Sequence, residues 1–425
     1  MSLRRSYGPD VPAVERRELW AWALFDFANS GYTTVVITAI FNAYFVGVVA
    51  AGHPAATLWW TAALSLSYLV VMAVGPQLGA LADRDASKRR ALLWTSLICI
   101  AGTAALAGAG SGQIALALGL VVLTNIAFGL GENLIAAFLP ELARPEAFGR
   151  LSGYGWGLGY LGGMLVLALC LYWIQQAPPE GTSAAVRQCM LITAVAFLLA
   201  ALPTFLWLRE RAAPVASAAD EGFWSGWRAL EDLRDLRRLL YCIVAYQAGV
   251  GTVITVAAIY TQEALGFTPA DSIKLILVVN LSAAVGAWVF GPLADLLGHR
   301  AALGLSLCGW LVALLLLGLD AEGRWIWWAA NLAGLCLGAS QSAGRAMVAY
   351  LCPPEREGRV FGFWGVAVKA SMVVGPLAYG SLSWLSGGDH RLAMICTGVF
   401  FVAGLLLLLP VNVARGRTQA AGGST

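Results

Sequence analysis

Long apolar runs alternate with short polar segments along this chain, and this alternation limits it to few folds. A helix that crosses the hydrocarbon core of a bilayer needs about 20 mainly apolar residues. Only 12% of the residues are charged and 59% are hydrophobic, whereas a soluble domain is about a quarter charged. We therefore expect an all-α integral membrane protein with about twelve transmembrane helices. The runs lie near residues 20–47, 58–81, 91–110, 113–139, 150–174, 188–208, 239–264, 272–294, 300–319, 325–351, 359–385 and 391–411.

The distribution of basic residues predicts how these helices are oriented. Loops that stay in the cytoplasm retain Lys and Arg. Of the 27 Lys and Arg residues, only Arg187, Lys274, Arg324 and Arg391 fall in loops on the side opposite the N-terminus. We therefore expect both termini to be cytoplasmic. Because no targeting segment is recognisable, we expect a multi-pass protein of the bacterial inner membrane.

A polar stretch at residues 209–238 separates the first six runs from the last six. Its beginning, APVASAAD, has the composition of a flexible linker. Further on, in residues 223–240, apolar residues such as Leu230, Leu233 and Leu236 recur at helical spacing between charges. This pattern favours an amphipathic helix on the membrane surface, with a plain connector as the alternative. The expected domains are 1–208, 209–238 and 239–425.

Two short pieces of sequence recur in the same order in both halves of the chain. GALAD at 79–83 returns as GPLAD at 291–295, and GRLSG at 149–153 returns as GRVFG at 358–362. The offsets are similar, and each piece holds a similar place within a set of six runs. An internal repeat of this kind predicts two parallel six-helix bundles.

The segments around the first repeated piece resemble a known loop signature. GPQLGALADRDASKRR, residues 75–90, is similar to the signature between the second and third helices of the major facilitator superfamily, and GPLADLLGHR, residues 291–300, is similar to its second-half copy. Ala86 and Ser87 stand where the signature usually has Gly. The resemblance implies two pseudo-symmetric bundles around a central cavity, and a loop motif that controls conformation. Its residues here are Gly79, Asp83, Arg84, Arg89, Gly291, Asp295 and Arg300.

We expect the carboxylate of Asp83, at the end of the second run, to pair with nearby basic residues or with a helix N-terminus, where anions are favoured. The first run, in contrast, resembles a narrower group. WALFDFANSGYTTVVITAIFNAYF, residues 22–45, is similar to the opening of the vacuolar amino-acid effluxer-like family, although Asn42 stands where members often have Pro. This resemblance implies transport of small polar solutes such as amino acids. The match is carried by Trp22, Asp26, Phe27, Ala28, Asn29, Ser30, Tyr44 and Phe45.

Four ionisable residues lie within the apolar runs. Asp26 and Glu132 are in the first half, and Arg345 and Lys369 are in the second. A charge in the bilayer interior costs at least about 2.5–3.5 kcal/mol, so each of these side chains should face a cavity or a partner.

Asp26, Asn29 and Thr33 share one helix face because they follow i, i+3, i+7 spacing. Together with Gln247 and Lys369 they form the predicted substrate or proton site. Asp26 would bind a proton or an amine, and Lys369 would anchor an anion such as a carboxylate. The alternatives for Asp26 are a structural hydrogen bond between helices or an ion pair at the cytoplasmic end of the span. For Lys369 they are a side chain that snorkels or one that bonds to carbonyl oxygens.

The internal repeat maps Glu132 close to Arg345, so we expect these two residues to form an ion pair between the halves. Such a pair would close the inner gate, with Gln341 one helical turn before Arg345. A buried pair adds little net stability, but the loss of one partner strands a charge, and this property suits a switch. In the alternative, each residue pairs within its own half.

The sequence therefore predicts a secondary-active transporter of small polar solutes, possible substrates being amino acids, that works by alternating access with or without protons. A sugar or drug transporter on the same fold is the nearest alternative, and a non-transporting receptor belongs to another class. We find no catalytic motif and expect no enzyme, no cofactor and no metal site. The net charge of +3 is too small to indicate nucleic-acid binding. The expected partners are a small-molecule substrate, protons and the lipid bilayer, and we expect a monomer.

Overall fold

The structure, a computed structural model, describes residues 12–214, 222–319 and 324–421, without the side chains of residues 258, 259, 263–265, 269, 270 and 273. All regular elements in these ranges are helical. The first half contains α1 (Arg16–Tyr32), α2 (Phe41–Tyr44), α3 (Ala56–Arg84), α4 (Lys88–Ala105), α5 (Ile114–Ala136), α6 (Leu139–Leu142), α7 (Phe148–Gln176) and α8 (Thr182–Trp207). Its shorter elements are two π-helical stretches, Thr33–Ala39 and Phe45–Val49, and three 3₁₀ turns, Leu106–Gly108, Pro145–Ala147 and Pro179–Gly181.

The second half follows a short connecting helix, α9 (Phe223–Arg228). It contains α10 (Arg234–Leu265), α11 (Pro269–Leu297), α12 (His299–Leu319), α13 (Ile326–Leu351), α14 (Glu357–Leu385), α15 (His390–Cys396), α16 (Gly398–Leu408) and α17 (Val413–Ala420).

Twelve long helical segments run in parallel along the molecule, as the apolar runs predict. Within the described residues, 11 segments are long and apolar enough to cross a membrane, and the first of these continues from α1 through the π-helical stretches to Val49. The twelfth is α13, with 26 residues. It is less apolar because it carries Gln341 and Arg345, and it is buried almost throughout its second half. The prediction of an all-α membrane protein with about twelve spans is confirmed.

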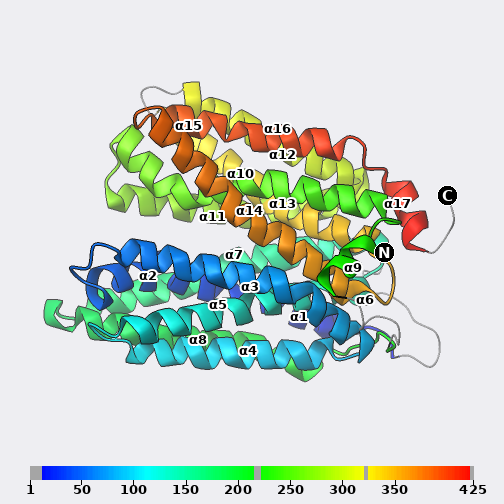
Figure 1. The fold of residues 1–425 in the computed structure, drawn as a ribbon, viewed down its shortest axis with the longest axis horizontal. Coiled ribbons are helices and arrows are strands. Elements are labelled where there is room, and N and C mark those ends of the chain that lie inside the picture. Colours follow the sequence, from blue (N-terminus) through cyan, green and yellow to red (C-terminus); the bar gives the residue numbers. More distant parts are fainter. Residues whose placement is uncertain (1–11, 215–221, 320–323, 422–425) are drawn as a thin grey trace.

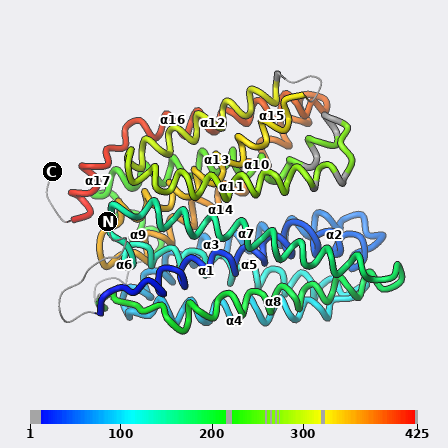
Figure 2. Tube along the Cα trace, turned by 180° about the vertical axis from the view of Figure 1, so that it is seen from behind, coloured from blue at the N-terminus to red at the C-terminus, as the bar shows by residue number. Residues whose placement is uncertain are grey.

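The two halves form separate bundles that lie side by side (Figures 1 and 2). Helices α1 to α8 make one bundle, and α10 to α17 make the other. Between the bundles, α3 packs against α14 and α7 packs against α11. Helix α1 begins, and α17 lies, at the same end of the molecule (Figure 1), which we call the terminal end. The predicted pair of six-helix bundles is therefore observed.

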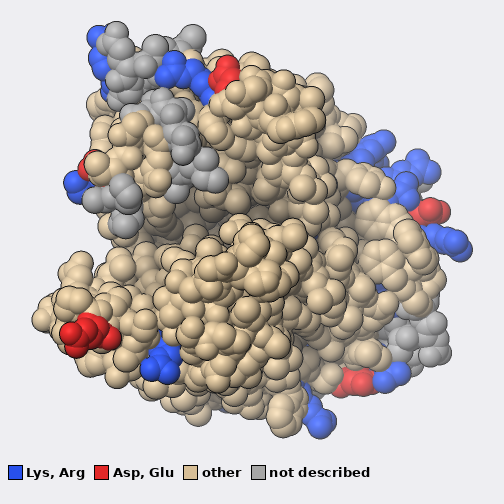
Figure 3. Space-filling model, turned by 60° about the vertical axis from the view of Figure 1, so that its left-hand side comes forward, with Lys and Arg blue, Asp and Glu red and all other residues tan. Residues whose placement is uncertain are grey.

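Glycines allow the two bundles to touch through their backbones near the terminal end. A Cβ atom on Gly79 of α3 would overlap the carbonyl oxygen of Gly358 in α14, and a Cβ atom on Gly153 of α7 would overlap the carbonyl oxygen of Ala287 in α11. Toward the other end, the surface is hollowed between the bundles (Figure 3). The molecule is therefore closed between the halves at the terminal end, and a hollow opens toward the opposite end.

Charged side chains gather toward the two ends of the molecule, and a broad uncharged belt lies between them (Figure 3). The belt exposes large apolar side chains such as Leu199 at 63% and Leu206 at 61%. Such a surface is stable against lipid but not against water. It marks the face that the bilayer covers.

The connecting segment differs from the long amphipathic helix expected at residues 223–240. Helix α9 ends at Arg228 and α10 begins at Arg234, with a turn between them. Leu230, Leu233 and Leu236 are buried in the protein rather than facing a membrane surface. The described part of the connecting segment is therefore a short helix followed by a turn, and not one continuous helix.

Candidate functional site

Arg345 of α13 is bound to the first half by polar and aromatic contacts with four residues. Its Nη1 lies 2.8 Å from Oδ2 of Asp26 in α1. Its Nε and Nη2 donate to the hydroxyl and carbonyl oxygens of Ser152 in α7, both at 3.0 Å. The guanidinium carbon lies 4.7 Å from the ring centroid of Trp22 and 5.2 Å from that of Trp156. The cation is buried, with 3% of its side chain exposed, and these contacts replace the water that it loses.

Two residues of the first half support this ion pair, one by fixing a ring beneath it and one by leaving space for it. The indole N–H of Trp22 donates to the carbonyl oxygen of Ile135 at 2.7 Å, which fixes the ring beneath the guanidinium. Gly155 of α7 faces the pair. A Cβ atom at this position would overlap the Asp26 carboxylate and lie 2.6 Å from the Arg345 guanidinium. The glycine-rich run of α7 therefore serves the charged site as well as helix packing.

Lys369 of α14 forms the second ion pair between the halves. Its ammonium group donates to Oε2 of Glu132 in α5 at 3.0 Å. It also lies 5.3 Å from the ring centroid of Phe128 and 5.8 Å from that of Tyr68. Lys369 is buried, and 20% of the Glu132 side chain is exposed. This pair is therefore the more accessible of the two, because the Asp26 side chain is 12% exposed.

The structure corrects the expected pairing of Glu132 with Arg345. Each of these residues does pair across the halves, but Glu132 binds Lys369 and Arg345 binds Asp26. The reason lies in the packing, since α5 contacts α14 and α13 contacts α7. Helices α5 and α13, the fourth and tenth spans, occupy equivalent places in the repeat. They do not face each other: α5 faces α14, the eleventh span, and α13 faces α7, the fifth span.

The remaining residues of the predicted site lie in different surroundings. The side-chain amides of Gln247 in α10 and Gln341 in α13 donate to each other's oxygen, at 2.7 and 3.3 Å. This contact lies within the second half, one turn from Arg345. Thr33 donates to the carbonyl oxygen of Ser30. The side chain of Asn29 is buried, at 7% exposed. Among the described residues, neither Thr33 nor Asn29 forms a hydrogen bond with the ion pairs, so the structure brings together only part of the predicted set.

The repeated sequence pieces meet each other at the terminal end. The carboxylate of Asp83, at the end of α3, accepts the backbone N–H groups of Gly358 and Arg359 at 2.8 and 2.9 Å. Those groups belong to the first turn of α14, in the other half. A carboxylate at this place satisfies N–H groups that have no partner within the helix and interacts favourably with the positive end of the helix dipole.

The second copy of the motif makes the same contact in the reverse direction. The carboxylate of Asp295, at the end of α11, accepts the backbone N–H groups of Gly149 and Arg150 at 2.8 and 3.0 Å. These groups begin α7 in the first half. Each GxLAD piece therefore caps the helix that begins with the Gly-Arg piece of the opposite half. We call the two contacts the reciprocal caps.

A buried lysine adds to the first of these caps. Lys88, at the start of α4, has no exposed side-chain surface and lies 2.6 Å from Glu141, 3.7 Å from Glu357 and 3.9 Å from Asp83. The sequence marks Lys88 only as part of a basic run, and nothing in that run distinguishes it from its neighbours. The other basic residues of the motif are at the surface. Arg84 pairs with Asp85 at 2.7 Å, and the Arg89 and Arg300 guanidinium groups donate to the carbonyl oxygens of Phe205 and Leu409.

Sequence comparison connects these features to known proteins. A sequence model of the family described as vacuole effluxer Atg22 like matches residues 55–421. An uncharacterized MFS-type transporter of Bacillus subtilis, YxiO, is 26% identical over 402 residues, which cover 91% of this chain and 93% of that protein. Autophagy-related protein 22-1 of Penicillium rubens is 25% identical over 302 residues, which cover 64% of this chain and 50% of that protein. The chain therefore spans about half the length of this fungal relative.

The fold is also similar to that of a solved transporter structure. The human organic anion transporter MFSD10 (TETRAN) superposes with a TM-score of 0.77 at 18% sequence identity, over 92% of this chain and 99% of that chain. At this identity the similarity shows the fold alone. It agrees with the two six-helix bundles described above.

Proposed function

Because the chain belongs to the Atg22-like vacuole effluxer family of major facilitator transporters, we propose that it carries a small zwitterion, such as an amino acid, across the membrane. The solute would carry one ammonium and one carboxylate group. The observation behind this proposal is the separation of charge between the halves. In the two ion pairs, both carboxylates, Asp26 and Glu132, are in the first half, and both cations, Arg345 and Lys369, are in the second.

A zwitterion can exchange partners with these residues without leaving a charge unpaired. Its ammonium group would bind a carboxylate of the first half, and its carboxylate would bind a cation of the second half. Removing one partner from a buried ion pair costs about 3–5 kcal/mol, and a bound zwitterion supplies both replacements at once. An uncharged solute supplies neither, so this arrangement favours zwitterions over sugars.

The same exchange gives a route to alternating access. With no solute bound, the two ion pairs and the reciprocal caps hold the halves together at the terminal end, and the hollow of Figure 3 admits solute from the other end. A zwitterion that takes over the ion pairs leaves the caps to hold the terminal end alone. The closed state is then weakened, and the solute can leave by that end.

Orientation and coupling are part of the proposal. The basic residues at the terminal end favour a cytoplasmic location for it, and the near full-length match to the Bacillus relative favours a bacterial cell membrane. Proton coupling follows from the same charges. A carboxylate that loses its cation during the cycle would be stranded in the membrane interior unless it took up a proton.

The test is transport by the purified protein in liposomes, with and without a pH gradient. Labelled neutral amino acids are the substrates, and matched compounds without the amino group or without the carboxylate are competitors. We expect only compounds with both groups to compete, and a pH gradient to accelerate uptake. Asp26→Asn and Lys369→Gln should each lower the rate at least about tenfold, because each strands one charge. Lys274→Gln, at an exposed lysine paired with Asp271, is the matched control and should transport normally.

Two results would contradict the zwitterion proposal. Unchanged amino-acid transport by both variants would show that the ion pairs do not contact the solute. Equal competition by compounds without an amino group would favour an organic anion instead, a second candidate suggested by the two buried cations and their aromatic neighbours.

A further inference from the structure

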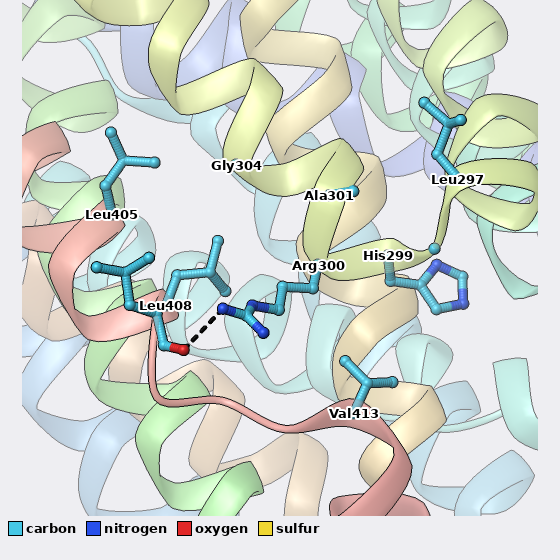
Figure 4. Close-up of a pocket in the computed structure, with 10 residues that line it drawn as sticks. Leu297, His299, Arg300, Ala301, Gly304, Leu405, Leu408 and Val413 are labelled. Atoms are coloured by element: carbon cyan, nitrogen blue, oxygen red, sulfur yellow. Dashed lines mark hydrogen bonds between the residues drawn. The ribbon is translucent and has the colours of Figure 1, made fainter.

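A pocket lies on the outer side of the second half, at the terminal end. It has a volume of about 450 Å³ and is lined by the α11–α12 turn, the first turns of α12, the end of α16 and Val413 of α17. Leu297, Leu405 and Leu408 supply apolar walls, and Arg300 reaches in from α12 toward the end of α16 (Figure 4). The pocket differs chemically from the ion-pair site, because its lining residues include the cation Arg300 and no carboxylate.

Arg300 is held in place at the pocket by one hydrogen bond. Its Nη2 donates to the carbonyl oxygen of Leu409 at 2.7 Å. Its other N–H groups have no acceptor among the described residues. The backbone N–H groups that open α12, at His299, Arg300 and Ala301, also lack one in that part of the chain. A guanidinium group and a helix N-terminus therefore face the same pocket, and both favour an anion.

The first half shows what fills the corresponding place there. At the start of α4, the Arg89 guanidinium donates to the carbonyl oxygen of Phe205 near the end of α8, just as Arg300 donates to Leu409 near the end of α16. The backbone N–H groups of Lys88 and Arg89 donate to the carboxylate of Glu210, at 2.8 and 3.1 Å. In the second half, the segment after α16 brings the apolar Val413 to the pocket. The first half thus supplies its own anion, and the described residues of the second half supply none at the pocket.

The surroundings of the pocket indicate what kind of anion it takes. Leu296, Leu297 and Leu409 are 79%, 57% and 63% exposed, and in a membrane protein such apolar surface faces acyl chains. Arg300 lies where α11 ends and α12 begins, and the ends of membrane-spanning helices are where lipid headgroups are expected. An occupant that matches both parts has an apolar tail and an anionic head.

We propose that this pocket binds an anionic membrane phospholipid. Its phosphate contacts Arg300 and the first turn of α12, and an acyl chain lies along Leu297 and Leu408. The lipid phosphate accepts the backbone N–H groups at the start of α12, as the Glu210 carboxylate accepts those at the start of α4. Because Asp295 lies two residues before Leu297 and caps α7, a lipid at this place also supports the closed terminal end.

The experiment counts bound lipid and measures its effect on stability. The purified protein is titrated with phosphatidylglycerol or phosphatidylcholine in mixed micelles, and complexes are resolved by native mass spectrometry while unfolding is followed by heating. We expect one phosphatidylglycerol to bind preferentially and raise the unfolding temperature. Arg300→Gln should weaken this binding about tenfold, the loss expected for one charge-assisted hydrogen-bonding partner. Arg90→Gln, at an exposed arginine of α4, should bind as the wild type does.

A second variant keeps the test valid if Arg300→Gln does not fold. Val413→Glu introduces a carboxylate at the pocket, in the role that Glu210 has in the first half. It should abolish the preferential binding of phosphatidylglycerol and raise the unfolding temperature in phosphatidylcholine. Three outcomes overturn the proposal. They are equal binding of the two lipids by the wild type, unchanged phosphatidylglycerol binding by both variants, or the same stabilisation from inorganic phosphate, which would assign the pocket to a soluble anion.

Discussion

At the scale of single residues, Arg345 shows how a buried charge can be both stable and exchangeable. The side chain has a carboxylate, two oxygens of one serine and two tryptophan rings around it. Only the carboxylate is a charge partner. In the proposed exchange, the serine and the rings would still surround Arg345 when Asp26 turns to a solute, as long as the terminal end stays closed.

Gly155 offers a direct test of this site. Gly155→Ala should reduce transport strongly and destabilise the fold by about 1–3 kcal/mol, as overpacking does, because the added methyl group overlaps the Asp26 carboxylate. Gly119→Ala is the matched control, since nothing lies within 4 Å of a Cβ atom at that helical position. It should be neutral or stabilise by about 0.5–1 kcal/mol. Transport in liposomes and thermal unfolding measure both, and an active Gly155→Ala protein would argue against a compact ion pair in the cycle.

The sequence identifies the four intramembrane charges and their distribution between the halves. It does not identify their partners. The position of Glu132 within an apolar run indicates that its carboxylate needs a polar partner. Which helix supplies that partner depends on how α5 is rotated and packed. This packing is set by contacts with the other bundle. Lys88 was missed for a similar reason. Its burial depends on Glu141 and Glu357, which come from distant parts of the chain.

At the scale of elements, the reciprocal caps connect helix ends that no covalent segment brings together. Asp83 ends α3 and caps α14, and Asp295 ends α11 and caps α7. Helix termini have several N–H groups without partners, so a carboxylate that leaves with the opposite bundle exposes them again. The sequence shows the repeats GxLAD and Gly-Arg, but a repeat does not reveal that its own two pieces touch across the halves.

Cys352 provides a native reporter of this contact. It follows α13, is 3% exposed, and burial raises the pKa of its thiol well above the ordinary range. Asp83→Asn should lower the cost of opening the terminal end by about 1.5–3 kcal/mol, and so speed maleimide modification of Cys352 about tenfold or more. Peptide mass spectrometry reads out this cysteine separately from the others. Asp85→Asn, which removes only a surface pair with Arg84, should leave the rate unchanged. A slow rate in both variants would mean that Asp83 does not hold the end closed.

At the scale of the whole molecule, two equivalent devices close the same end. The length and apolarity of the runs were enough to predict twelve helices in two bundles, because lipid requires complete helical spans. They could not predict which end of the molecule is closed. A molecule closed at the terminal end and one closed at the opposite end have the same helices, and they differ only in the contacts between the halves.

Since the two caps hold the same end, removing both should have more than an additive effect. We expect Asp83→Asn with Asp295→Asn to raise the rate of Cys352 modification beyond the product of the two single effects, because the single variants retain one cap each. Hydrogen exchange at the first turns of α7 and α14 should rise in parallel. A strictly multiplicative rate would show that the two caps open independently.

The reciprocal caps also bear on how such a chain could arise. Each bundle carries an aspartate that fits the other bundle's helix and a helix start that fits the other's aspartate. Two identical copies of a six-helix ancestor with both pieces would therefore have matched each other about a twofold axis, as the faces of a symmetric dimer do. A single chain that joins two such bundles therefore joins partners whose contacts are already complementary.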